Sequence, residues 1–166
     1  VDIEPSQINN RVLGCNGCVG DLAHVLPELT RAVEKSETPV CAEWILHIEE
    51  NRAKWLDTTE VPCVHGIHPN LFMHNLSLIF RDAAGFVADV GKNQMWAAQS
   101  LQIHECQRIL FSGGMGSMGF ALPAAIGACF ASSKEIVVIS GDGGMQRNIQ
   151  ELQTIRHHKL PVKIVV

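Results

Sequence analysis

The sequence lacks the features that mark several common classes of protein. None of its apolar runs approaches the roughly 20 residues that a membrane-spanning helix requires, so no membrane partner is expected. It has no stripe of basic residues and its formal net charge is −4, which argues against nucleic acid as a partner. No segment has the character of a secretory signal peptide, and we expect a cytoplasmic protein.

Two common phosphate-binding motifs are also absent. No Gly-x-Gly-x-x-Gly follows a predicted strand with an acidic residue about 20 positions later, and no Gly-Lys-Ser/Thr loop occurs. These absences argue against a non-catalytic nucleotide-binding module, which stays open as an alternative. What is present is 166 residues with 46% hydrophobic and 18% charged residues, a composition typical of a globular protein.

Six cysteines occur without a secretory signal, and we expect reduced thiols rather than disulfides. Cys15 and Cys18 have the spacing of redox and zinc sites, but no second pair follows at the distance of a zinc ribbon. Cys63, His65 and His68 could chelate a metal, but they lie in a poorly patterned linker. We interpret both groups as incidental.

Strand patterns alternate with helix patterns over the second half of the chain. Such alternation predicts an α/β fold, a parallel sheet with helices on both faces. The expected strands are residues 85–90, 108–111, 136–139 and 162–166, and the expected helices are residues 94–101, 122–131 and 148–157. Earlier in the chain we expect a strand at residues 1–3, a helix capped by Asp21, a surface helix at residues 41–56 and a helix opened by Pro69.

Two glycine clusters stand out. Gly141, Asp142, Gly143 and Gly144 follow a β-branched apolar run directly, as expected for a turn between a strand and a helix. Glycines let the backbone approach a ligand and free its amides to meet phosphate oxygens, while an aspartate offers a hard oxygen ligand for Mg²⁺. Diphosphate with a divalent metal is therefore the first hypothesis, against a plain turn as the alternative.

The second cluster is the segment 112–128, which has four glycines in seven positions before an Ala-rich stretch. It suggests a loop whose backbone approaches another group closely, or else a close-packed helix with no ligand. Asp89-Val90-Gly91 and Gly141-Asp142-Gly143 both fall at carboxyl ends of expected strands, where parallel sheets bind their ligands.

Residues 89–99, 112–128 and 141–152, in this order, resemble the diphosphate-binding domain of thiamine-diphosphate-dependent enzymes, and in particular the acetolactate synthase large (catalytic) subunit. Residues 1–8 and 19–21 resemble the end of that family's middle domain. The resemblance implies three parts: residues 1–36 as the end of a Rossmann-like middle domain, 37–66 as a linker with a surface helix, and 67–166 as the diphosphate-binding domain. Because Val166 ends an apolar strand without a turn, we expect a fragment incomplete at both ends.

The resemblance also implies the cofactors, thiamine diphosphate and Mg²⁺, and a role for each matched residue. Asp142 is the implied metal ligand, within a cofactor-binding set of Gly91, Lys92, Asn93, Gly116, Met118, Gly141, Asp142, Gly143 and Gly144. Gly143 and Gly144 would donate backbone N–H groups to the diphosphate, and Met118 would support the bent cofactor from below. At Lys92-Asn93 the chain departs from the family, which has Gln-His there.

The implied reaction of the longer protein is decarboxylation of a small 2-oxo acid and transfer of the carbanion to an acceptor carbonyl. The family's activating glutamate lies on another domain, usually of a partner subunit. We therefore expect no catalytic residue on this chain, no activity of the chain alone, and a homo-oligomer whose subunits share the site. A simple decarboxylase, or a natural separate subunit of a split enzyme, remains an alternative. FAD, bound by some relatives through the middle domain, cannot be judged from residues 1–36.

Overall fold

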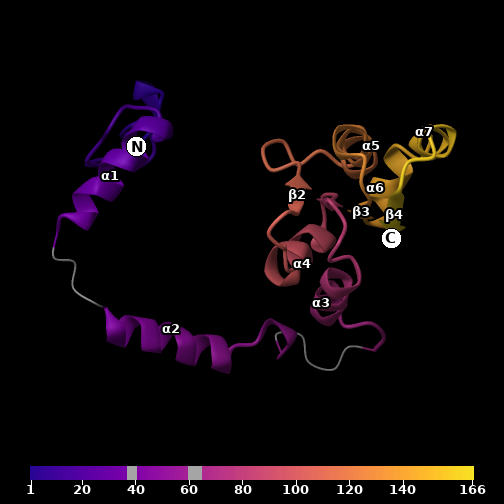
Figure 1. Cartoon of the computed structure of the whole chain (residues 1–166), viewed down its shortest axis with the longest axis horizontal. Helices are drawn as coiled ribbons and strands as arrows, with labels where there is room; N and C mark the ends of the chain where they lie inside the picture. The colour runs from indigo at the N-terminus through magenta and orange to yellow at the C-terminus, as the bar shows by residue number, and fades with distance from the viewer. Residues whose placement is uncertain (37–40, 60–64) are drawn as a thin grey trace. The chain divides into compact units, whose positions relative to one another are not determined.

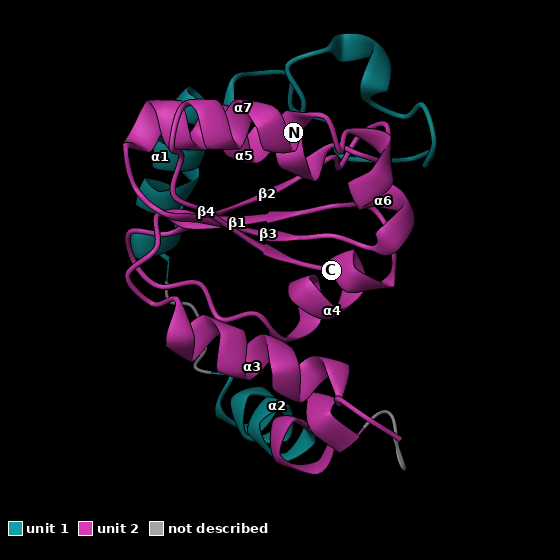
Figure 2. Cartoon of the chain, turned by 90° about the vertical axis from the view of Figure 1, so that its right-hand side faces the viewer, with its two compact units in different colours: residues 1–51 teal, residues 52–166 magenta. Residues whose placement is uncertain are grey.

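The computed structural model describes residues 1–36, 41–59 and 65–166. It divides into two compact units, residues 1–51 and 52–166 (Figures 1 and 2), and each is described by itself. The division into three parts at residues 36 and 66 stays a prediction.

The first unit is helical. Helix α1 (Leu22–Glu34) follows a short 3₁₀ helix η1 (Pro5–Gln7), and α2 (Ala42–Lys54) begins in this unit and ends in the next. The carboxylate of Asp21 accepts a hydrogen bond from the Ala23 amide at 2.8 Å, which confirms the predicted cap of α1. The strand predicted at residues 1–3 is wrong, since only an isolated bridge between Asp2 and Val19 forms there.

The second unit is built on a four-stranded sheet in the order β2-β1-β3-β4, with every neighbouring pair parallel (Figure 2). The strands are β1 (Gly85–Ala88), β2 (Arg108–Phe111), β3 (Ile136–Ile139) and β4 (Val162–Val165). Both central strands, β1 and β3, are buried along their whole length, as expected for strands covered on two faces. The predicted fold class is confirmed.

Helices cover both faces of this sheet (Figure 2). On one face α3 (Pro69–Ile79) and α4 (Lys92–Ser100) pack over Phe86 and Val137, and on the other α5 (Ala121–Ser132) and α7 (Glu151–His157) pack over Val87 and Val138. The side chains of neighbouring residues in one strand thus pack into hydrophobic cores on opposite faces of the sheet, as the pleat requires. The 3₁₀ helix η2 (Asp57–Thr59) precedes α3.

The segment after β3 differs from the prediction. Instead of a turn and one helix over residues 148–157, a short helix α6 (Asp142–Arg147) comes first and α7 begins at Glu151. Asn148 separates the two helices with φ −130° and ψ 35°. Its side-chain amide donates to the Gly119 carbonyl at 2.7 Å, and this tertiary contact overrides the continuous helical pattern.

Candidate functional site

A cleft of about 990 Å³ opens at the carboxyl ends of β1 and β3 in the second unit. Eight of the nine predicted cofactor-binding residues line it: Gly91, Lys92, Asn93, Met118, Gly141, Asp142, Gly143 and Gly144. Gly116 does not line it and lies in the exposed loop just before Met118. The apolar wall of the cleft comes mainly from the starts of α3 and α4: Ile67, Pro69, Phe72, Met73, Met95 and Trp96.

The turn at the start of α4 is shaped by Gly91 and Asn93. Gly91 has φ +144°, and a Cβ on it would lie 2.6 Å from the Asn93 Oδ1 atom, so no other residue fits without displacing that amide. The Asn93 Nδ2 atom donates to the carbonyl oxygens of Asp89 at 2.8 Å and Ile139 at 3.2 Å. Asn93 therefore ties together the ends of two strands. Lys92 is the exposed first residue of α4.

The turn after β3 carries Asp142, which is exposed at the first position of α6. Gly143 beside it faces Met118, since a Cβ on Gly143 would lie 3.8 Å from the Met118 Sδ atom. Met118 itself is 52% exposed. It is a cleft-lining side chain and not a core methionine.

Asp89 is a residue whose role could not be read from the sequence motifs. It is 1% exposed, and its Oδ1 atom accepts hydrogen bonds from the amides of Val90 at 2.8 Å and Gly119 at 3.0 Å. Its Oδ2 atom accepts from the Ala121 amide at 3.1 Å. A lone acidic residue at the end of an apolar strand was the available signal, since such a carboxylate requires hydrogen-bond donors nearby.

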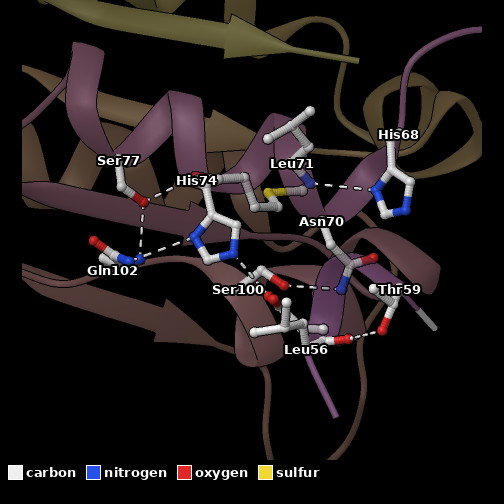
Figure 3. A network of polar contacts seen from close by, with 11 residues as sticks. Leu56, Thr59, His68, Asn70, Leu71, His74, Ser77, Ser100 and Gln102 are labelled. Atoms are coloured by element: carbon white, nitrogen blue, oxygen red, sulfur yellow. Dashed lines mark hydrogen bonds and ion pairs between the residues drawn. The ribbon is translucent and has the colours of Figure 1, made fainter. Parts of the chain in front are cut away.

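A polar network reaches the cleft wall at Asn70 (Figure 3). The Asn70 Nδ2 atom donates to Ser100 Oγ at 2.8 Å, and Ser100 is also hydrogen bonded to the carboxylate of Asp57. The Asp57 Oδ2 atom lies 2.8 Å from His74 Nε2. The hydrogen bond from Ser100, helped by His74, holds the pKa of Asp57 below its usual value against the opposing effect of burial.

The hydrogen bond to Ser100 uses the amide nitrogen of Asn70. Figure 3 shows the Asn70 amide oxygen turned away from Ser100. That buried oxygen has no partner among the residues that the structure describes.

The other candidate metal ligands do not form a cluster. Within residues 1–36, 41–59 and 65–166, no three His, Cys, Asp or Glu side chains come together to hold a metal ion. Cys15 and Cys18 are exposed thiols. Cys63 lies outside the described residues, and His68 caps α3 by accepting from the Leu71 amide at 3.4 Å. In the same ranges no helix combines the length and the apolar character needed to cross a membrane.

Known proteins are similar to this chain over its second unit and over its whole length. Residues 89–166 match the family model described as "Thiamine pyrophosphate enzyme, C-terminal TPP binding domain". The chain is 35% identical over 170 residues to the acetolactate synthase large subunit of Pyropia yezoensis, an alignment that covers 100% of this chain and 28% of the relative. It is 35% identical over 170 residues to the acetolactate synthase isozyme 3 large subunit of Escherichia coli (strain K12), covering 99% of the chain and 29% of the relative.

An archaeal relative is similar to the same extent. The probable acetolactate synthase large subunit of Methanocaldococcus jannaschii is 34% identical over 176 residues, covering 100% of this chain and 29% of the relative. Residues 89–166 are therefore similar to the C-terminal TPP binding domain of thiamine pyrophosphate enzymes. The resemblance to acetolactate synthase large subunits, inferred from the motifs, is confirmed.

The chain spans only 28 to 29% of the length of these curated relatives. A reaction carried out by a whole enzyme does not follow from the similarity alone. The family description names thiamine pyrophosphate and gives no support for FAD.

Proposed function

We propose that the cleft binds thiamine diphosphate together with Mg²⁺. The observation that carries this proposal is the convergence of two glycine turns and Met118 on one cleft at the carboxyl edge of a parallel sheet. Ligands of such sheets bind at this edge. The nine residues assigned from the sequence keep their proposed roles here, with Gly116 acting from the adjoining loop.

The residues present fit the cofactor. Gly141 and Gly143 leave room for close approach, because a Cβ on either would meet nothing nearer than 3.7 Å. The exposed N-terminal residues of α4 and α6, including Lys92, can bring amide N–H groups and a positive charge to a diphosphate. The apolar wall around Phe72 and Trp96 suits the uncharged part of the molecule.

For the metal, Asp142 would supply one carboxylate oxygen. Mg²⁺ commonly takes one or two carboxylates and completes its shell with phosphate oxygens and water. The absence of a three-residue cluster among the described side chains is compatible with such a site. Met118 would lie beneath the cofactor and set its bend.

We further propose that the longer protein decarboxylates a small 2-oxo acid and joins the product to an acceptor carbonyl. The names of the relatives support this class of reaction. The cofactor supplies the carbanion chemistry, and this chain's residues bind and orient it. The activating carboxylate would come from another domain in a homo-oligomer, so the 166-residue chain should bind without turnover.

Isothermal titration calorimetry on the chain tests the binding. We expect thiamine diphosphate to bind with Mg²⁺ present and to lose most of its affinity in EDTA. Asp142→Ala should abolish the dependence of cofactor binding on Mg²⁺. Asp82→Ala, which replaces an exposed aspartate at the opposite end of the strands, should leave this dependence unchanged. Binding of ATP or NAD⁺ in place of thiamine diphosphate would instead identify a nucleotide-binding module.

A further inference from the structure

Asp89 is a buried carboxylate that does not itself line the cleft. In the described part of the chain no ion pair involves it. A buried charge needs hydrogen-bond donors to offset its lost hydration. The three backbone amides of Val90, Gly119 and Ala121 fill this need.

These hydrogen bonds join segments that are far apart in sequence. Gly119 and Ala121 lie 30 and 32 residues beyond Asp89, at the point where the glycine-rich loop enters α5. At three earlier glycines of the loop, Gly113, Gly114 and Gly116, an added Cβ would meet nothing within 4 Å. Met118 lies one residue before this anchor, which Asp89 shares with Asn148, whose side-chain amide donates to the Gly119 carbonyl at 2.7 Å.

The same carboxylate also lies against α6. A Cβ on Gly144 would lie 2.8 Å from Asp89 Cγ, 3.0 Å from its Oδ1 atom and 3.0 Å from Ser140 Oγ. Only a glycine lets the first turn of α6 lie this close to the carboxylate. Asp142 sits two residues earlier in that turn.

We propose that Asp89 is a positioning residue of the cleft, whose carboxylate holds Met118 and Asp142 at a fixed separation so that both reach one bound molecule. This inference rests on the proposed function, which makes that molecule thiamine diphosphate. Asp89 acts through the backbone of the loop and through Gly144, and does not contact the cofactor.

Asp89→Asn tests, in the absence of cofactor, whether the carboxylate of Asp89 holds the loop through Gly119 and Ala121. The variant keeps the size of the side chain but directs an NH₂ group at a backbone N–H. Losing a hydrogen bond to a charged group should speed amide hydrogen exchange roughly ten- to a hundredfold at Gly119 or at Ala121, whichever amide faces the NH₂ group. The amides of Val137 and Val138 in the core strand β3 should change much less. An equal increase at all four amides would mean a general loss of stability and would overturn the proposal.

Cofactor affinity tests the consequence. Thiamine diphosphate with Mg²⁺ is titrated into both proteins at a temperature where circular dichroism shows each to be folded. We expect about a tenfold or greater loss of affinity in Asp89→Asn, and none in Glu105→Gln, an exposed control at the opposite edge. Equal affinity in Asp89→Asn and the unaltered chain would overturn the proposal about Asp89 and leave the proposed function standing. If the unaltered chain does not bind thiamine diphosphate, the proposed function fails. Hydrogen exchange then shows whether Asp89 holds the loop independently of any cofactor.

A double-mutant cycle is an independent test of the contact between Asp89 and Gly144. Gly144→Ala should lower the melting temperature and the affinity, because its methyl group meets Asp89. In an Asp89→Ala background the same change should cost less, since the nearest crowding group is gone and only Ser140 Oγ still lies within 3.0 Å of the added Cβ. Gly127→Ala is the matched control, a helical glycine whose added Cβ meets nothing within 4 Å. Equal costs of Gly144→Ala in both backgrounds would contradict the inference.

Discussion

The side-chain amide of Asn93 lies 3.2 Å from the carbonyl oxygen of Ile139 and donates a hydrogen bond to it. The same nitrogen donates to the Asp89 carbonyl at 2.8 Å. One side chain near the start of α4 thereby holds the carboxyl ends of β1 and β3 together. The two turns that line the cleft follow directly from these strand ends, which the backbone hydrogen bond from the Asp89 amide to the Ile139 carbonyl at 2.8 Å also joins.

This contact predicts that two substitutions of Asn93 lower the free energy of unfolding to different extents. Asn93→Ala removes both hydrogen bonds and should lower the free energy of unfolding by about 1–2 kcal/mol. Asn93→Asp should cost more, because a carboxylate would face two carbonyl oxygens. Thermal and urea unfolding of the three proteins measure the order. An exposed turn residue would behave in the reverse way, since an aspartate in the first turn of a helix is normally stabilising; a more stable Asn93→Asp would contradict the role given to Asn93.

Met118 should matter for the cofactor more than for the fold. Because the side chain is half exposed, Met118→Ala should change the free energy of unfolding by less than about 1 kcal/mol, whereas a core methionine would cost roughly 2–5 kcal/mol. Affinity for thiamine diphosphate should fall modestly. In the longer protein the turnover per active site should fall further, since misplacement by about 1 Å can cost on the order of a hundredfold.

Met115→Ala is the matched control, because this methionine of the same loop is 91% exposed and does not line the cleft. It should leave stability, affinity and turnover unchanged. A large stability loss with normal turnover in Met118→Ala would show that this residue is structural.

Asp57 should make the second unit sensitive to acid. Its pKa is lowered in the folded chain, first by the Ser100 hydrogen bond and then by His74. A carboxylate with a lowered pKa contributes stability above the pKa of the unfolded chain, usually about 3.9, and this contribution is lost as the pH falls through the folded value. The stability difference between the unaltered chain and Asp57→Asn should therefore be constant near neutral pH and shrink below about pH 4.

Ser100→Ala separates the contributions to this effect. It removes the largest cause of the shift, so carboxyl NMR should find the pKa of Asp57 raised relative to the unaltered chain. An unchanged pKa would mean that His74 and the backbone hydrogen bond at Thr58 account for the shift.

The sheet and the two glycine turns were predictable from the sequence because their signals are local, whereas Lys92, Asn93 and Met118 were assigned from the family resemblance. The apolar runs that became β2 and β3 are predicted correctly to the residue, and the glycines after β1 and β3 mark the turns of the site. The contacts of Asp89 and Asn70 were not predictable. They join residues 30 or more positions apart, and only the folded chain brings these together. Asn148 interrupts a helical pattern for the same reason.

Gly119 offers the sharpest test of how the glycine-rich loop is anchored. It has φ +90°, and a Cβ there would lie 2.6 Å from Arg147 Cβ and 3.0 Å from Asn148 Nδ2. Gly116 in the same loop also has a positive φ, of +63°, but a Cβ on it would meet nothing within 4 Å.

Each Gly→Ala change carries the backbone cost of a positive φ, on the order of 1 kcal/mol. Only Gly119→Ala adds a steric clash and disturbs the hydrogen bond between Asn148 and the Gly119 carbonyl. We therefore expect Gly119→Ala to lower the free energy of unfolding by about 1–3 kcal/mol more than Gly116→Ala does. Urea unfolding of both variants measures the difference. Equal losses would show that the anchor at Gly119 yields to a methyl group, and that the loop is not held at this point.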